Sequence, residues 1–400
     1  MALHQKPLIA ETQRSVPRKA AARRRGSLIV LCCVALLAIG CAFWAWLDPS
    51  VIPTVVDIAR GIVGPGPVAQ IEAWVFQAQD TARQTVYRTT GAQRQIEWAA
   101  PAATLTPRHA SPPPTVSNAT SGVTDSTPFA TSTALPASDI WSPFMTTADG
   151  QPVLERALIA PDPDRPYAQA ALVRIDLRQT LLHLVAGTHE PVSTLHVARP
   201  GRIPPAEYPQ LLAAFNGGFK AVNGAFGMAV DGATLLPPRN DLATLALYRD
   251  GSVRLGVWGR DMHLAPDMVA FRQNCPLLVD DGKVTALGDT DDPALWGNTV
   301  NHRVATWRSG LGLSANGRFL IYAAGDSLTV QTLAQALVMG GADRAMQLDI
   351  NSYWTRFVTY TPAADGHTPV AQKLIDTMVG NTRQFLAPDT RDFFYVTAER

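Results

Sequence analysis

An uninterrupted apolar run near the N-terminus constrains this chain more than any other feature. Residues 26–47 contain no charged side chain. As a helix they would extend roughly 33 Å, enough to cross a hydrocarbon core of about 30 Å. Seven lysine and arginine residues and one acid, Glu11, precede the run. Because positive charge stays on the cytoplasmic side of a membrane, we expect a cytoplasmic tail over 1–26, a single-pass transmembrane signal-anchor over 27–47, and the rest outside the cytoplasm.

The same run allows a second interpretation, in which Cys41 is the lipidated residue of a bacterial lipoprotein. The sequence Leu-Ala-Ile-Gly-Cys over residues 37–41 is a tolerable cleavage box. The apolar run continues through Phe43, Trp44 and Trp46, however, which favours a membrane span with aromatic residues at the interface. Both interpretations place the main domain outside the cytoplasm.

The net charge of +1 divides unevenly along the chain. Residues 1–47 carry a net +6, so the remainder is near −5, and a mildly acidic exterior part argues against a nucleic-acid partner. Three of the four cysteines lie in the apolar run, which leaves Cys275 alone outside it. We therefore expect no disulfide in the exterior part and a buried Cys275. No residue spacing identifies a cofactor or metal, and a need for a divalent cation stays open.

The segment between the apolar run and the main domain divides into two parts. Over residues 48–100 we expect a juxtamembrane segment, because apolar residues between Pro67 and Tyr87 recur at helical spacing. The apolar face of that helix could pack on the main domain or lie on the bilayer. Residues 101–138 are rich in Ser, Thr and Pro and predict a disordered tether, which leaves 139–397 as one folded domain.

Short strands with tight turns dominate the folded domain. Asp250-Gly251 and Asn316-Gly317 each lie between apolar runs, which predicts two β-hairpins. Helices are expected only at Ser327–Met339 and near Pro369–Val379. The pattern predicts an α+β fold, with a mainly antiparallel or mixed sheet and helices packed on it.

The acid Asp349 is the first candidate for a functional residue. The helix expected at 327–339 can be capped by Ser327 or Thr329, and glycines 340 and 341 end it. A short apolar strand over 345–348 follows and ends on Asp349. A carboxylate at a strand end is held rigidly and still reaches the loops where substrates bind.

Ser327 also belongs to a sequence, Gly-Asp-Ser-Leu over 325–328, that matches the nucleophile motif of the GDSL esterases. That chemistry needs an Asp-x-x-His downstream, and none follows Ser327. A helix cap explains Ser327 better.

Several segments, in the right order, resemble the phosphodiester glycosidase family. They cover about Ala171 to Tyr360 and include Asn216-Gly217-Gly218-Phe219, Gly227–Gly232, Cys275–Val279 with Asp281-Gly282, Arg308–Leu313 and Leu348-Asp349. The resemblance implies hydrolysis of sugar-1-phosphodiester bonds, with a glycan or glycosyl-phosphate as substrate. Together with the apolar run, it predicts a membrane-anchored extracytoplasmic hydrolase.

The resemblance also assigns roles to individual residues. Asp349 would be the catalytic carboxylate, and Arg308 would hold the phosphate, since a guanidinium matches phosphate bidentately. The anion-facing loop would be Asn216, Gly217 and Gly218. Further phosphate or substrate contacts would come from Asn351, Arg303 and His302.

The sequence departs from the family at one place. The family reads Leu-Asp-Gly-Gly-Gly-Ser, whereas this chain reads Leu-Asp-Ile-Asn-Ser-Tyr over 348–353. The side chains that follow Asp349, among them Asn351 and Trp354, could supply hydrogen-bond donors and a sugar-stacking ring instead. The alternative is a non-catalytic glycan-binding or scaffold domain of the cell envelope on the same fold, and transfer of the sugar to another acceptor is also open.

Overall fold

The computed structural model describes residues 58–59, 62, 65–92, 95–105, 140–288, 296, 305–350, 352–363 and 368–399. The chain divides into two units, Met1–Gly64 and Pro65–Arg400, and nearly all described residues belong to the second. Within these residues, no helix is both long enough and apolar enough to span a membrane. The apolar run at 27–47, predicted as the membrane anchor, lies outside the described residues.

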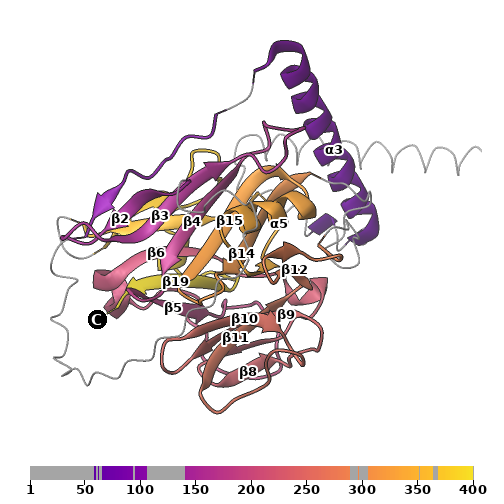
Figure 1. Cartoon of the computed structure of the whole chain (residues 1–400). Helices are drawn as coiled ribbons and strands as arrows, with labels where there is room; N and C mark the ends of the chain where they lie inside the picture. Colours follow the sequence, from indigo (N-terminus) through magenta and orange to yellow (C-terminus); the bar gives the residue numbers. More distant parts are fainter. Residues whose placement is uncertain are drawn as a thin grey trace, which may run out of the picture. The chain divides into compact units, whose positions relative to one another are not determined.

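A nine-stranded sheet forms the largest layer of the second unit (Figure 1). All its pairings are antiparallel except that of its first two strands. In spatial order the strands are β1 (Ala103–Thr104), β2 (Ser142–Thr146), β3 (Pro152–Ile159), β4 (Ala170–Asp176), β15 (Phe319–Leu328), β14 (Thr306–Leu313), β16 (Arg344–Gln347), β12 (Leu277–Asp280) and β13 (Lys283–Val284).

Two five-stranded antiparallel sheets complete the β structure. One contains β18 (Val370–Lys373), β17 (Phe357–Thr361), β6 (Leu211–Asn216), β19 (Phe393–Ala398) and β5 (Thr180–Val185). The other contains β10 (Val253–Val257), β9 (Ala243–Tyr248), β11 (Met268–Asn274), β7 (Met228–Val230) and β8 (Ala233–Leu236). The predicted sheet-dominated fold with few helices is therefore confirmed, and the Asp250-Gly251 turn joins β9 to β10 as expected.

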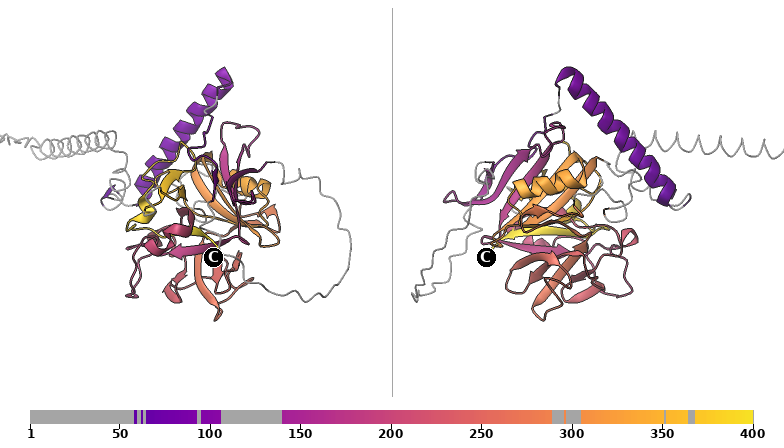
Figure 2. Two further views of the ribbon diagram at one scale, coloured as in Figure 1. Left: turned by 90° about the vertical axis from the view of Figure 1, so that its left-hand side faces the viewer. Right: turned by 45° about the vertical axis from the view of Figure 1, so that its right-hand side comes forward.

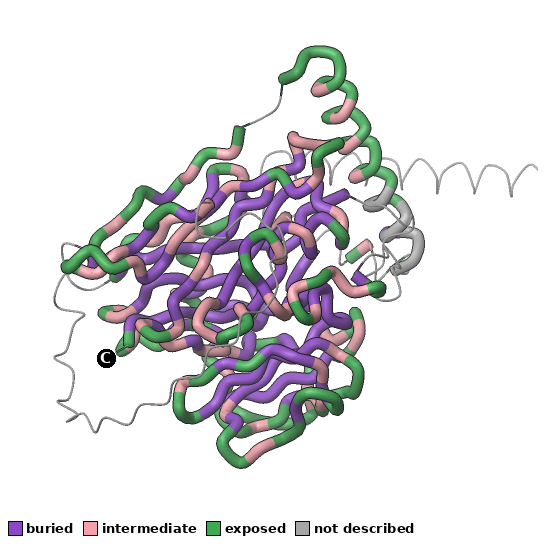
Figure 3. The backbone as a smooth tube through the Cα atoms, in the orientation of Figure 1, coloured by how far each residue is buried: buried purple, intermediate pink, exposed green. Residues whose placement is uncertain are grey.

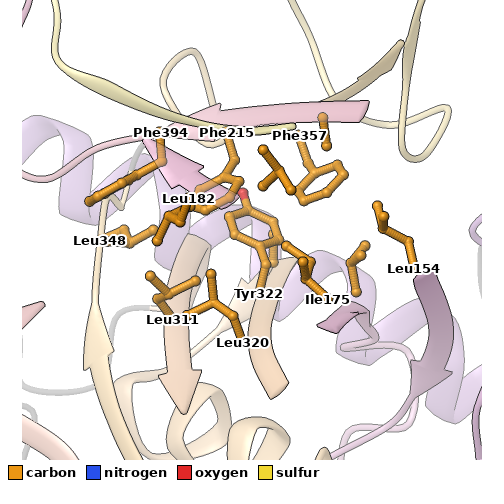
Figure 4. Close-up of a cluster of buried hydrophobic side chains, with 14 of the residues drawn as sticks. Leu154, Ile175, Leu182, Phe215, Leu311, Leu320, Tyr322, Leu348, Phe357 and Phe394 are labelled. Carbon is orange, nitrogen blue, oxygen red and sulfur yellow. The ribbon is translucent and has the colours of Figure 1, made fainter. Parts of the chain in front are cut away.

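The main core lies between the nine-stranded sheet and the sheet that contains β6 (Figure 4), and side chains of β9, β10 and β11 from the third sheet extend it. Phe215 of β6 stacks on Phe357 and Phe394 from the neighbouring strands, with ring centroids 5.7 and 5.5 Å apart. Tyr322 of β15 meets the same cluster from the other sheet, 5.2 Å from Phe215. This aromatic packing fixes the end of β6, and hence the loop after it, against β14 and β16.

The helix α5 (Val330–Met339) packs on one face of the nine-stranded sheet (Figures 1 and 2). Two glycines of β14 make that close approach possible, because a Cβ at Gly310 or Gly312 would lie within 3 Å of Leu337 or Ala342. Thr329 caps the helix in a capping box with Thr332. Ser327 instead remains in β15, with a positive φ of 61°. Short 3-10 turns are η3 (Pro205–Gln210), η4 (Ala221–Asn223) and η5 (Gln384–Leu386).

The helix expected near Pro369–Val379 is not present, and that prediction was wrong. Val370–Lys373 forms the edge strand β18, paired with Val358–Thr361 of β17. Apolar residues in this stretch satisfy a helical spacing, but the unpaired edge of β17 offers the backbone a longer-range partner. Sheet pairing therefore overrides the local pattern here.

The segment before the main domain contributes to the fold. The helix α3 (Pro65–Thr90) confirms the helix expected between Pro67 and Tyr87. After it, Trp98 forms a bridge with Ile375, and Ala100 and Leu105 are buried in the main core. The tether predicted over 101–138 therefore begins no earlier than residue 106, because β1 pairs with β2.

Candidate active site

The backbone of Asp349 is fixed by β14 after β16 has ended. The amide of Ser309 donates to the carbonyl of Asp349 at 2.8 Å, and the amide of Leu348 donates to the carbonyl of Ser309 at 2.8 Å. The hydroxyl of Ser309 accepts from the Asp349 amide at 3.2 Å. Asp349 thus continues the ladder in the middle of a sheet, which holds its side chain in one position.

The Asp349 carboxylate forms a buried ion pair with Arg391. Its Oδ2 lies 2.8 Å from Nη2 of Arg391, and its Oδ1 accepts from the amide of Ile350 at 2.8 Å. Only 4% of the residue is exposed. Burial raises the pKa of Asp349, while the Arg391 cation and the Ile350 N–H act in the opposite direction and the nearby Asp392 adds to the rise. The pKa of Asp349 is therefore set by opposing effects, burial and Asp392 on one side and its two hydrogen-bond donors on the other.

Arg391 connects this carboxylate to the double-glycine loop. Its Nη2 also donates to the carbonyl of Gly218 at 2.8 Å, and its guanidinium carbon lies 4.6 Å from the ring centre of Trp354. The buried Nε of Arg391 has no hydrogen-bond partner within the described part of the chain. A buried cation with an unused donor is suited to receive an anion.

A small pocket opens at this ion pair, with a cavity volume of about 10 Å³, room for about one water molecule. A second carboxylate faces it: Oδ1 of Asp389 accepts from the Arg391 amide at 3.0 Å, and Oδ2 accepts from the side chain of Gln384. The lining residues are Asn216, Gly217, Asp349, Trp354, Gln384, Phe385, Asp389, Arg391 and Asp392. The pocket therefore combines carboxylates, one guanidinium and aromatic rings.

Asn216 forms the corner between the two sheets at this pocket. Its Nδ2 donates to the hydroxyl of Ser309 at 3.0 Å, and its Oδ1 accepts from the hydroxyl of Tyr322 and the amide of Arg356, both at 3.1 Å. All of these partners are buried. Asn216 thus fixes the position of the loop after β6 relative to Asp349.

The double-glycine loop binds a carboxylate of the protein itself, that of Asp392. The amide of Gly217 donates to the carbonyl of Asp392 at 3.0 Å, and the amide of Gly218 donates to its Oδ2 at 3.2 Å. The same carboxylate pairs with Nε of Arg272 at 2.8 Å, and both side chains are almost fully buried. Nη2 of Arg272 in turn donates to the carbonyl of Phe219 at 2.7 Å. These contacts hold the loop in place.

Arg308, expected to hold the phosphate, lies outside the pocket lining. Its Nε donates to the carbonyl of Leu328 at 3.0 Å, and its Nη1 donates to Oε1 of Gln347 at 2.9 Å. It alternates along β14 with Ser309, so its side chain shares the face of the sheet that carries α5. The expected contact residues His302, Arg303 and Asn351 lie outside the described residues.

The structure therefore brings Asn216, Gly217, Gly218 and Asp349 together and adds residues that the sequence did not single out. Arg391, Asp392 and Asp389 come from the segment just before β19, and Arg272 comes from β11. The signal in the sequence is that three of the four residues over 389–392 are charged, directly before the apolar strand 393–398. No cluster of three His, Cys, Asp or Glu side chains among the described residues could hold a metal ion.

The close approach of Gly217 to Asp392 gives a testable result. A Cβ at Gly217 would lie 2.0 Å from Oδ2 of Asp392, whereas one at Gly218 would lie 3.1 Å from the Arg272 guanidinium. We expect Gly217→Ala to lower the free energy of unfolding by about 1–3 kcal/mol, because the buried carboxylate must move. Gly218→Ala is the matched control with a smaller loss, and urea denaturation measures both. Equal stability of the Gly217→Ala variant and the unmodified chain would contradict the structural role.

Comparison with known proteins supports the resemblance seen in the sequence. Residues 210–372 match the family model described as phosphodiester glycosidase. This range includes the loop at Asn216 and the acid Asp349, and it ends before Arg391. No curated protein matches the sequence significantly.

Three solved structures are similar at low identity. The catalytic domain of zebrafish N-acetylglucosamine-1-phosphodiester alpha-N-acetylglucosaminidase, auto-inhibited by its pro-peptide, is 15% identical with a TM-score of 0.41, over 62% of this chain and 85% of that one. A hypothetical protein from Synechocystis is 13% identical with a TM-score of 0.34, over 62% of each chain. A putative exported protein from Burkholderia pseudomallei K96243 is 13% identical with a TM-score of 0.29, over 52% of this chain and 74% of that one.

Proposed function

Because residues 210–372 match the family model described as phosphodiester glycosidase, we propose that the chain hydrolyses sugar-1-phosphodiesters. Water adds to the anomeric carbon and releases a proton to the solvent, the bond from that carbon to the phosphate oxygen breaks, and the electron pair leaves with the phosphomonoester. The products are the free sugar and the monoester. The observation that carries the proposal is the buried Asp349–Arg391 pair in a pocket also lined by Trp354.

In this proposal Asp349 acts at the anomeric carbon. Breaking the glycosidic bond develops positive charge on the sugar, and a carboxylate stabilises that charge. Little protonation of the leaving group is needed, since a phosphomonoester is already a stable anion. The contacts from Arg391 and the Ile350 amide favour the ionised form of Asp349 against the effect of burial. The residue that replaces the family's first glycine thus still orients the carboxylate through its backbone.

Arg391, rather than Arg308, is our candidate for the phosphate contact. It lines the pocket and has a buried donor, Nε, without a partner in the described part of the chain. The Arg308 guanidinium is engaged with Leu328 and Gln347 on the helix side of the sheet. We assign Arg308 to positioning, because Gln347 immediately precedes Leu348 and Asp349. Trp354 offers a flat ring beside the cation for the sugar.

We further propose that the enzyme is anchored in a membrane by residues 27–47, with its folded domain outside the cytoplasm. The support is the uncharged apolar run and the basic residues before it. A soluble fragment for assays should start before α3 rather than after the tether, because Ala100 and Leu105 belong to the main core.

The proposal is tested by incubating the full chain, solubilised in mild detergent, with a panel of sugar-1-phosphodiesters. Phosphorus NMR follows the release of the monoester. We expect monoester to appear with at least one member of the panel. Saturable binding of a panel member without any monoester, by protein shown to be folded, would favour the glycan-binding alternative and contradict hydrolysis.

A further inference from the structure

The helix α3 presents its polar side to the rest of the second unit. Asp80 pairs with Arg165 at 3.0 Å, and Arg83 pairs with Asp326 at 2.7 Å. Tyr87 lies on the same side, with its ring centre 5.9 Å from that of Tyr167. These contacts attach the helix to the loop before β4 and to β15. On the opposite side Val68 is buried, and the residues from Ile71 onward are exposed.

The opposite side carries an apolar stripe. Positions on a helix turn by about 100° per residue, so residues 71, 74, 75, 78, 82 and 86 share one side, opposite Asp80. Ile71 is 64% exposed, Trp74 70%, Val75 38% and Val86 51%, and Figure 3 shows most of the described part of this helix as exposed. The stripe contains no charged residue. A helix that packs on a core turns its apolar side inward, whereas α3 turns its apolar side outward. The stripe is therefore suited to an apolar environment outside the domain.

The position of the stripe along the chain indicates that this apolar environment is the membrane surface. The uncharged run predicted to cross the membrane ends at Leu47, and residues 48–64 can span at most about 60 Å before α3 begins. This connection allows α3 to reach the bilayer surface. The stripe also carries Trp74, and tryptophan is enriched at the level of the lipid headgroups.

We propose that α3 lies on the outer surface of the lipid bilayer, with the stripe of residues 71, 74, 75, 78, 82 and 86 in the headgroup region. The helix then connects the membrane to the catalytic domain through its polar side, at Asp80 and Arg83. This interaction surface is independent of the hydrolytic activity, since none of its residues lines the pocket.

The test places an environment-sensitive fluorophore on a single cysteine of the full chain, reconstituted into vesicles of phosphatidylcholine and phosphatidylglycerol. The cysteines of the N-terminal apolar run are replaced by alanine, and Cys275 stays because it is fully buried. One variant carries Ala78→Cys in the stripe, and the matched control carries Gln77→Cys, turned by about 100° from it. Both positions are exposed.

We expect a quencher attached to the lipid chains to act on the probe at position 78 at least about threefold more strongly than on the probe at 77. Aqueous iodide should show the opposite order. Adding Ile71→Glu with Trp74→Glu should abolish this difference without lowering the melting temperature, because the contacts with the domain lie on the other side of the helix. Gln77→Glu with Thr81→Glu is the control pair, and it should leave the difference in quenching between the two probes unchanged.

Two results would overturn the proposal. Equal access of iodide to both probes, in chains that float with the vesicles, would show that α3 stays in water. A probe at 78 that is shielded from iodide but not quenched from the lipid, together with disulfide cross-linking between two unlabelled chains of the Ala78→Cys variant, would instead identify a second copy as the partner.

Discussion

Replacing Asp349 by asparagine should lower kcat/KM for a sugar-1-phosphodiester by about 10³-fold or more, in the range observed when a catalytic carboxylate or base is removed. Asparagine keeps the shape of the side chain, but its single oxygen can accept from only one of the two donors, Arg391 or the Ile350 amide. It cannot carry the negative charge that stabilises the sugar cation in the transition state. Initial rates of monoester release by phosphorus NMR measure the effect.

The same variant separates a catalytic role from a structural one. We expect the variant to remain folded with a lower melting temperature, because the amide has one accepting oxygen in place of the two that bind Arg391 and the Ile350 amide. Asp281→Asn is the matched control, since the side chain of Asp281 is 85% exposed and lies away from the pocket lining. Full activity of Asp349→Asn would remove this residue from the mechanism, and a large loss of stability with little loss of kcat would mark it as structural.

Replacing Asp392 by alanine should lower the free energy of unfolding by about 3–5 kcal/mol, since it leaves a buried guanidinium without its partner. The side chains of Arg272 and Asp392 are 1% and 0% exposed, and the Asp392 carboxylate also accepts from the Gly218 amide. The loop at Gly217 and Gly218 would lose its anchor at the same time. Urea denaturation at neutral pH measures the change.

Two further variants show whether the effect comes from the unpaired charge. Arg272→Met combined with Asp392→Leu should recover part of the lost stability, because burying an apolar pair avoids the cost of desolvating a cation. Arg260→Ala is the control, because the Arg260 side chain is 49% exposed in its pairs with Asp261 and Asp280. We expect this variant to lose about 1 kcal/mol or less of unfolding free energy. A loss below that level for Asp392→Ala would refute the anchoring role.

The two buried pairs differ in what they contribute to the site. Arg272 and Asp392 satisfy each other and the backbone of the loop, so their charges are used within the protein. Arg391 is shared between Asp349, the Gly218 carbonyl and the Trp354 ring, and its Nε stays unused among the described residues. The first pair therefore supports the pocket, and the second can respond to a bound phosphate.

The sequence by itself determined the features that depend on neighbours in the chain. The turn at Asn316-Gly317 requires a positive φ that glycine supplies, and it joins β14 to β15 as predicted. The cap of α5 was narrowed to two residues, and the structure selects Thr329. The strand that ends before Asp349 was likewise visible, because a short apolar run between a helix end and a polar loop has few other structures available.

Only the tertiary structure decided which residues surround Asp349. Arg391 is far from it in sequence and reaches it because β19 pairs with β6, while β6 ends beside β14. Other long-range contacts had similar effects. Pairing with β17 made the stretch at Val370 a strand, and the Gly218 amide met Asp392. The Arg308 guanidinium bound the carbonyl of Leu328 on the helix side of the sheet. Local propensity and periodicity report which face of a strand is buried. They do not report which strands become neighbours, since sheet partners are chosen by the packing of the whole core.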